Sequence, residues 1–76
     1  MSVENLQKRL TTERILENHL MLLNSKLDTI RNLAEATGRS SLIGSVSALK
    51  RANTDAIKSV RRSKINTLKI LGSIKP

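Results

Sequence analysis

The sequence predicts an all-α protein in which two long helices form a helical hairpin. Three observations predict this fold class. Apolar residues recur at steps of four and three from Leu16 to Ala34, a second helical pattern begins at Leu42, and Thr37-Gly38 separates the two patterns. In addition, the 76 residues include no aromatic residue and no cysteine. The core must therefore come from aliphatic side chains, as in helix bundles and coiled coils.

The first predicted helix covers residues 1–37 and carries the heptad seam. Ser2 suits the N-cap, and Gly38 suits the left-handed position just past the C-terminus. Because an apolar seam packs against other helices, we interpret residues 1–37 as an amphipathic oligomerisation helix. Ile15 and Leu22 widen the seam, which favours a bundle of three or more helices. The predicted oligomerisation residues are Leu16, Leu20, Leu23, Leu27 and Ile30.

The heptad pattern does not continue to the start of this helix. Arg9 and Glu13 fall at seam positions, where a coiled coil carries apolar residues. The seam is therefore interrupted there, and the unbroken pattern is short for a coiled coil.

Residues 38–44 are predicted to form a loop or hinge, because glycine and serine favour turns. A basic amphipathic helix then covers residues 45–72, and residues 73–76 form a tail. The motif Asn53-Thr54-Asp55 is typical of an N-cap, so a kink or break in the second helix stays open. A short loop favours an antiparallel hairpin that assembles into an oligomeric bundle. The alternative is one long bent helix in a coiled coil, with the loop as a hinge.

The net positive charge of the chain lies entirely in its second half. Residues 1–38 contain five basic and five acidic residues, whereas residues 39–76 contain nine basic residues and only Asp55 as an acid. The net charge of +8 therefore belongs to residues 39–76. Segregation of this kind indicates an anionic partner.

Nucleic acid, DNA or RNA, is the partner that this pattern favours. The predicted binding residues are Lys50, Arg51, Lys58, Arg61, Arg62, Lys64 and Lys69. Because no aromatic residue is available to stack on bases, binding would be driven by phosphates and weakly sequence-specific. A virion or nucleoid component or a small regulator would suit this design. One alternative is an assembly module whose basic helix meets an acidic partner protein, and the third is an amphipathic helix on a membrane surface.

The sequence gives no sign of an enzyme, and we predict no catalytic residue, metal site or cofactor. The only imidazole is His19, there is no cysteine, and the glycines lack the spacing of a phosphate loop. A chain of this size without disulfides or metal has a marginal core, so we expect a homo-oligomer. No secretory signal or membrane span is recognised, so a cytoplasmic, nuclear or virion location is expected.

Overall fold

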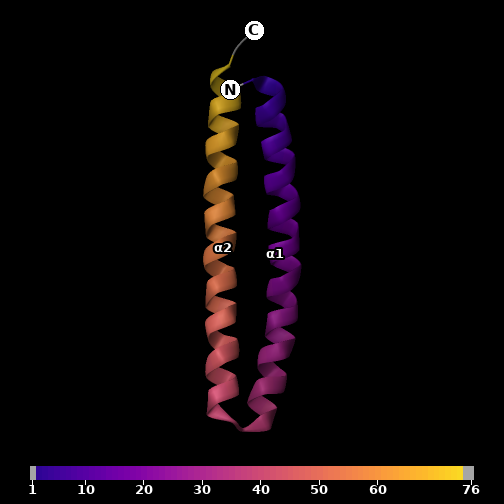
Figure 1. Ribbon diagram of the computed structural model, residues 1–76, viewed down its shortest axis with the longest axis vertical. Helices are drawn as coiled ribbons and strands as arrows, with labels where there is room; N and C mark the ends of the chain where they lie inside the picture. Colours follow the sequence, from indigo (N-terminus) through magenta and orange to yellow (C-terminus); the bar gives the residue numbers. More distant parts are fainter. Residues whose placement is uncertain (1, 75–76) are drawn as a thin grey trace.

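The computed structural model describes residues 2–74, which form two antiparallel α-helices joined at one end (Figure 1). Helix α1 spans Val3–Thr37 and helix α2 spans Ser40–Ser73. Together they form a rod with extents of 60 × 14 × 13 Å. The predicted all-α helical hairpin is confirmed.

Local hydrogen bonds fix both ends of α1 where the sequence places them. The Ser2 hydroxyl accepts a hydrogen bond from the backbone N–H of Asn5 at 3.2 Å, which satisfies one of the free donors of the first turn. Gly38 has φ 69° and donates its N–H to the Glu35 carbonyl at 3.0 Å. A left-handed residue with no Cβ ends the helix without strain.

The second helix begins at Ser40, ahead of the predicted start at residue 45. Residues 40–44, predicted as loop, are helical, and only Gly38 and Arg39 connect the helices. Glycine inside a helix costs about 1 kcal/mol relative to alanine. The first turn forms ahead of Gly44 all the same, with the N–H groups of Leu42 and Ile43 donating to the Arg39 carbonyl at 3.1 Å. Residues 73–76 were predicted to form a tail, but Ser73 is the last residue of α2. Residues 75 and 76 lie outside the described part of the chain.

Helix α2 is continuous through residues 53–55, so the kink that the sequence left open does not occur. Asn53 is buried, and its Nδ2 donates to the backbone carbonyl of Leu20 at 3.0 Å. The Thr54 hydroxyl donates to the Lys50 carbonyl at 3.1 Å. Both side chains therefore find partners without ending the helix.

The other polar atom of Asn53, its Oδ1, is buried without a hydrogen-bond partner among the described residues. An unpaired buried acceptor costs stability. We expect Asn53→Leu to raise the free energy of unfolding by about 1 kcal/mol, since the substitution replaces this acceptor with apolar volume. Urea unfolding followed by circular dichroism measures the change. A loss of stability would show that the hydrogen bond to Leu20 contributes more than the unpaired oxygen costs.

The two helices pack through a seam that differs in phase from the predicted heptad. Of the predicted oligomerisation residues, Leu27 is buried inside the hairpin and Leu20 is partly buried. In contrast, Leu16, Leu23 and Ile30 remain 48%, 43% and 41% exposed. The predicted seam is thus divided: two of its residues hold the hairpin together and three lie on its surface.

The interior of the hairpin is unusually polar for its size. The buried residues include Glu13, Asn53 and Thr67 beside the aliphatic ones. The apolar core consists of Leu6, Leu10, Leu27, Ala34, Ile57 and Val60. A core this small provides little hydrophobic stabilisation, so polar contacts between α1 and α2 carry much of the specificity of the fold.

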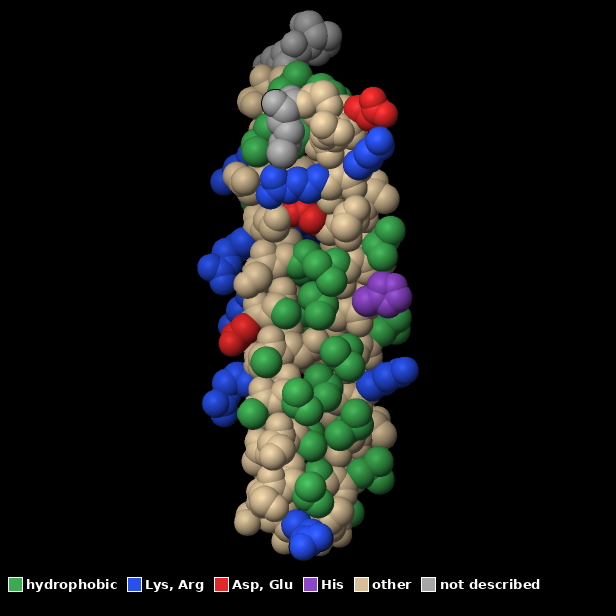
Figure 2. Space-filling model, in the orientation of Figure 1, with side chains coloured by type: hydrophobic (Ala, Val, Ile, Leu, Met, Phe, Trp, Pro, Cys, Tyr) green, Lys and Arg blue, Asp and Glu red, His purple; other side chains and the backbone are tan. Residues whose placement is uncertain are grey.

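Hydrophobic side chains gather along the middle of one face of the rod, over both helices (Figure 2). A shallow hollow on the surface brings Leu16 of α1 and Ala56 of α2 together. Residues seven apart lie two helical turns apart on nearly the same side, which extends this surface along both helices. We name it the apolar face and define it by Leu16, Leu23, Ile30, Leu42, Leu49 and Ala56. Among the described residues, no stretch of either helix is long and apolar enough to cross a bilayer.

Candidate functional site

Three of the seven predicted nucleic-acid-binding residues form ion pairs with α1. Lys50 pairs with Asp28. Arg61 Nε lies 2.9 Å from Glu17 Oε2, and Lys64 Nζ lies 2.6 Å from Glu17 Oε1. These three cations therefore serve the hairpin itself, and each binds a carboxylate of the same chain.

Glu17 is held in its ionised form by its two partners. Hydrogen bonds from Lys64 and then Arg61 lower the pKa of Glu17 below its usual value, and they outweigh the opposing effect of burial. The carboxylate stays charged at neutral pH, and both of its oxygens are occupied. Glu17 thus fixes two of the candidate cations against α1.

Among the described residues, the other four predicted binding residues remain available to an external partner. All four are exposed and none takes part in an ion pair there. We name this set the basic row; it consists of Arg51, Lys58, Arg62 and Lys69. Their spacing of seven, four and seven residues places them on one side of α2, over an axial distance of about 27 Å at 1.5 Å per residue. Figure 2 shows Lys and Arg side chains gathered along the outer edge of α2.

The hairpin relieves only part of the electrostatic repulsion within the basic row. Lys58 and Arg62 are one helical turn apart, and like charges at this spacing destabilise a helix. Asp55, the only acidic residue of α2, lies one helical turn from both Arg51 and Lys58, but no ion pair joins it to a cation in the described structure. A ligand with closely spaced negative charges would relieve this repulsion.

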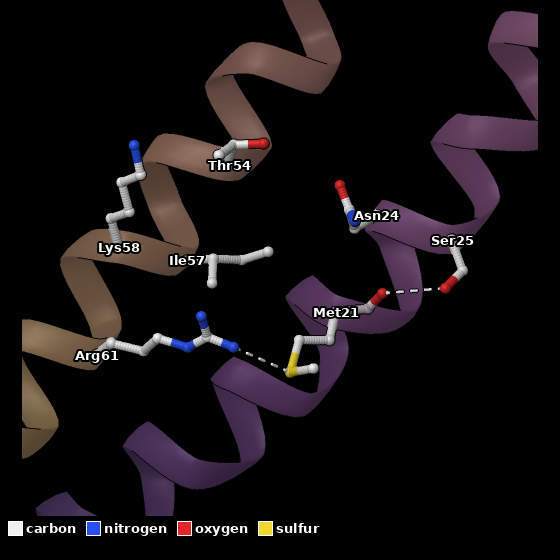
Figure 3. A pocket seen from close by; sticks show the side chains of 7 residues that line it. All are labelled: Met21, Asn24, Ser25, Thr54, Ile57, Lys58 and Arg61. Atoms are coloured by element: carbon white, nitrogen blue, oxygen red, sulfur yellow. Dashed lines mark hydrogen bonds between the residues drawn. The ribbon is translucent and has the colours of Figure 1, made fainter.

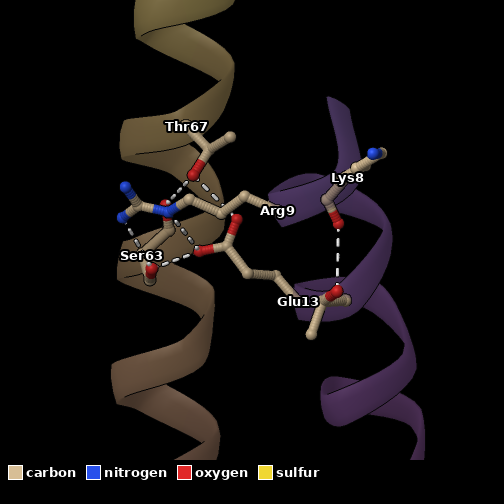
Figure 4. A network of polar contacts seen from close by, with 6 residues as sticks. Lys8, Arg9, Glu13, Ser63 and Thr67 are labelled. Carbon is tan, nitrogen blue, oxygen red and sulfur yellow. Dashed lines mark hydrogen bonds and ion pairs between the residues drawn. The ribbon is translucent and has the colours of Figure 1, made fainter. Parts of the chain in front are cut away.

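A second polar cluster lies between the helices near their free ends (Figure 4). Glu13 accepts hydrogen bonds from the hydroxyls of Ser63 and Thr67, the latter at 2.7 Å. Arg9 Nε lies 3.7 Å from Glu13, and Arg9 also donates to the Ser63 hydroxyl at 3.3 Å. The sequence signal for this cluster is the interruption of the heptad at Arg9 and Glu13, although its partners on α2 could not be predicted.

The chemistry of this cluster is structural. Burial by itself raises the pKa of Glu13, but hydrogen bonds from Ser63 and Thr67 and the charge of Arg9 outweigh it, so the pKa lies below its usual value. A carboxylate with a lowered pKa is a weak base, which does not suit activation of Ser63 as a nucleophile. The cluster instead fixes the register of α1 against α2.

Another shallow hollow, lined by residues of both helices, offers no reactive group (Figure 3). Its lining residues are Met21, Asn24, Ser25, Thr54, Ile57, Lys58 and Arg61. Arg61 Nη2 donates to the Met21 sulfur at 3.7 Å, and the Ser25 hydroxyl donates to the Met21 carbonyl at 3.5 Å. The lining contains neither a carboxylate nor an imidazole, and no set of three or more metal-binding side chains occurs within residues 2–74.

Comparison of this chain with family models, curated proteins and solved structures finds no match. The fold defines the class as an all-α helical hairpin, and function has to be argued from the surface that the hairpin displays. On that surface, internal packing accounts neither for the basic row nor for the apolar face.

Proposed function

We propose that this protein binds nucleic acid through the basic row, by contacts to phosphates that are independent of sequence. The observation that supports this proposal is the division of the seven candidate cations. Lys50, Arg61 and Lys64 are paired with α1, whereas the four cations of the basic row point to one side without a carboxylate partner among the described residues.

The geometry of the basic row suits a polyanion. Duplex DNA carries one negative charge per about 1.7 Å of its axis, so a row about 27 Å long meets more phosphates than it has cations. Each cation can then find a phosphate without a fixed register. Since the chain has no aromatic side chain for base stacking, affinity would come from charge.

The placement of the apolar residues makes a membrane surface a weaker candidate. A helix that lies on a membrane presents its cations beside the apolar side chains that enter the lipid. Here Leu42 and Leu49 belong to the apolar face, whereas the basic row lies along the outer edge of α2 (Figure 2). Of the exposed large hydrophobic residues in the described part of α2, Ile65, 51% exposed, is the one beside the row. An acidic protein remains an outcome of the test below.

The salt dependence of binding to a short duplex tests the number of phosphate contacts. Four contacts predict a slope of log affinity against log salt of about −3.6 per chain, and seven contacts predict about −6. Fluorescence anisotropy with a labelled duplex, from about 50 to 200 mM salt, measures this slope. A slope near zero would contradict the proposal.

Two matched triple variants separate the basic row from total charge. Arg51→Gln, Lys58→Gln and Arg62→Gln remove three charges from the row, and we expect affinity to fall by roughly 100-fold or more without loss of helicity. The control removes three charges from the ion pairs with α1: Lys50→Gln, Arg61→Gln and Lys64→Gln. It should keep most of the affinity and melt at a lower temperature. Equal losses in both variants, or binding to anionic vesicles in place of the duplex, would overturn the assignment.

A further inference from the structure

We propose that the apolar face is the interface between two copies of this chain. The copies lie face to face about a two-fold axis parallel to the long axis of the rod, so that α1 of each copy packs on α2 of the other and both loops lie at the same end. The product is a four-helix bundle. This proposal does not depend on nucleic-acid binding, because the basic row is not part of the interface.

The exposure of large aliphatic residues is the first support. Leu16, Leu23 and Leu49 of the apolar face are 48%, 43% and 58% exposed. Figure 2 shows hydrophobic side chains gathered along one face of the rod. Contiguous apolar surface of this kind usually marks an interface. Within one hairpin this surface stays uncovered, because other residues, Glu13 and Asn53 among them, occupy the seam between α1 and α2.

The shapes of the two halves of the apolar face complement each other. The α1 half presents bulky side chains, Leu16, Leu23 and Ile30. Beside Leu16, the α2 half presents small residues, and the hollow there is lined in part by Ala56, Ser59 and Ser63. At the level of this hollow, rotation by 180° about the long axis places Leu16 of each copy against the small side chains of α2 of the other, as a knob into a hole. A two-fold interface of this kind uses the same surface on both copies.

Charge distribution and area favour the same arrangement. Two chains of net charge +8 repel, but the basic row of each copy would lie outside the bundle, away from the shared surface. The α2 half of the apolar face carries no charged residue at its defining positions. The whole side of a rod 60 Å long and 14 Å wide is about 800 Å², so an interface that uses the full length of the rod, with the apolar face at its centre, reaches the area that each partner of a standard stable interface buries.

Sedimentation velocity of the full chain with two matched substitutions tests the interface. Leu23 on the apolar face and Leu68 elsewhere on the rod are equally exposed, at 43%. Wild type and Leu68→Asp should sediment as dimers at micromolar concentration. Leu23→Asp should weaken dimerisation by about 100-fold or more, because it places two unpaired carboxylates in the interface. A monomeric wild type, or equal effects of both substitutions, would overturn the proposal.

Cysteine crosslinking tests the arrangement of the copies, and it does so independently of duplex binding. The natural chain has no cysteine, so every crosslink reports an introduced pair. An oxidised mixture of Leu23→Cys chains with Ala52→Cys or Ala56→Cys chains should give mixed disulfides, since disulfides need Cα atoms within about 7 Å. Leu23→Cys chains alone should stay uncrosslinked. Efficient crosslinking of Leu23→Cys to itself would place the loops at opposite ends and overturn the two-fold axis proposed here.

Discussion

Leu27→Asn is expected to unfold the hairpin, whereas the same substitution at Leu33 is expected to have little effect. Leu27 is 5% exposed between α1 and α2, and Leu33 is 64% exposed on the surface of α1. An asparagine at position 27 buries an amide in place of an apolar side chain of similar size, at a cost of about 3 kcal/mol. A domain of this size has only about 3–5 kcal/mol of stability from its core, so most of the folded population would be lost.

Far-UV circular dichroism with a thermal melt measures this effect. The two asparagine substitutions match in chemistry and in helix, and they differ only in burial. We choose asparagine because the cation of Lys50, which pairs with the neighbouring Asp28, could compensate an aspartate at position 27. A Leu27→Asn chain that keeps a cooperative melt near that of the wild type would mean that the helices do not pack through this seam.

Removal of the Glu13 carboxylate is expected to cause the second largest loss in the free energy of unfolding. Glu13 is 7% exposed, and it accepts hydrogen bonds from Ser63 and Thr67 beside Arg9. Glu13→Ala removes the acceptor and leaves a small cavity, which should cost about 2 kcal/mol at neutral pH. Glu4→Ala is the control: Glu4 pairs with Lys8 on the exposed surface of α1, and such pairs contribute about 0–1 kcal/mol.

The pH dependence of stability tests whether the charge of the Glu13 carboxylate, and not only its volume, stabilises the folded chain. Its pKa in the folded chain lies below the ordinary value of 4.5, so the folded state binds this proton less well than the unfolded state. The stabilisation is therefore complete above about pH 4.5 and is lost as the pH falls through the lower folded pKa. Chemical denaturation at a series of pH values should show this loss in the wild type and a smaller loss in Glu13→Gln. Identical profiles would assign the acid sensitivity to other carboxylates, Glu17 among them.

The sequence predicted the helices well because helix formation depends on local signals. The steps of four and three from Leu16 to Ala34 occur only in a helix, and Ser2 and Gly38 supply the caps. The start of α2 was predicted too late, because Gly44 and the neighbouring serines favour a turn locally. In the folded chain, hydrogen bonds from the N–H groups of Leu42 and Ile43 to the Arg39 carbonyl form the first turn ahead of Gly44.

The phase of the seam could not be predicted from the heptad. Two adjacent stripes of α1 share Leu20 and Leu27, and they differ in whether Leu23 or Asn24 lies beside them. A pattern of apolar residues favours the stripe with Leu23. The structure uses the other stripe: Asn24 is half-buried, Leu23 is 43% exposed, and Glu17 pairs with Arg61 and Lys64 of α2.

By itself, the sequence determined that this protein is two helices with a charged second half, because periodicity, caps and charge can be read residue by residue. Only the tertiary structure decided which of the candidate cations form ion pairs with α1 and which remain exposed and unpaired in the described chain. All seven candidates look alike along the chain, and Arg61 and Arg62 are even neighbours. What separates them is the distance to a carboxylate on the other helix, and such distances exist only once α1 and α2 are packed.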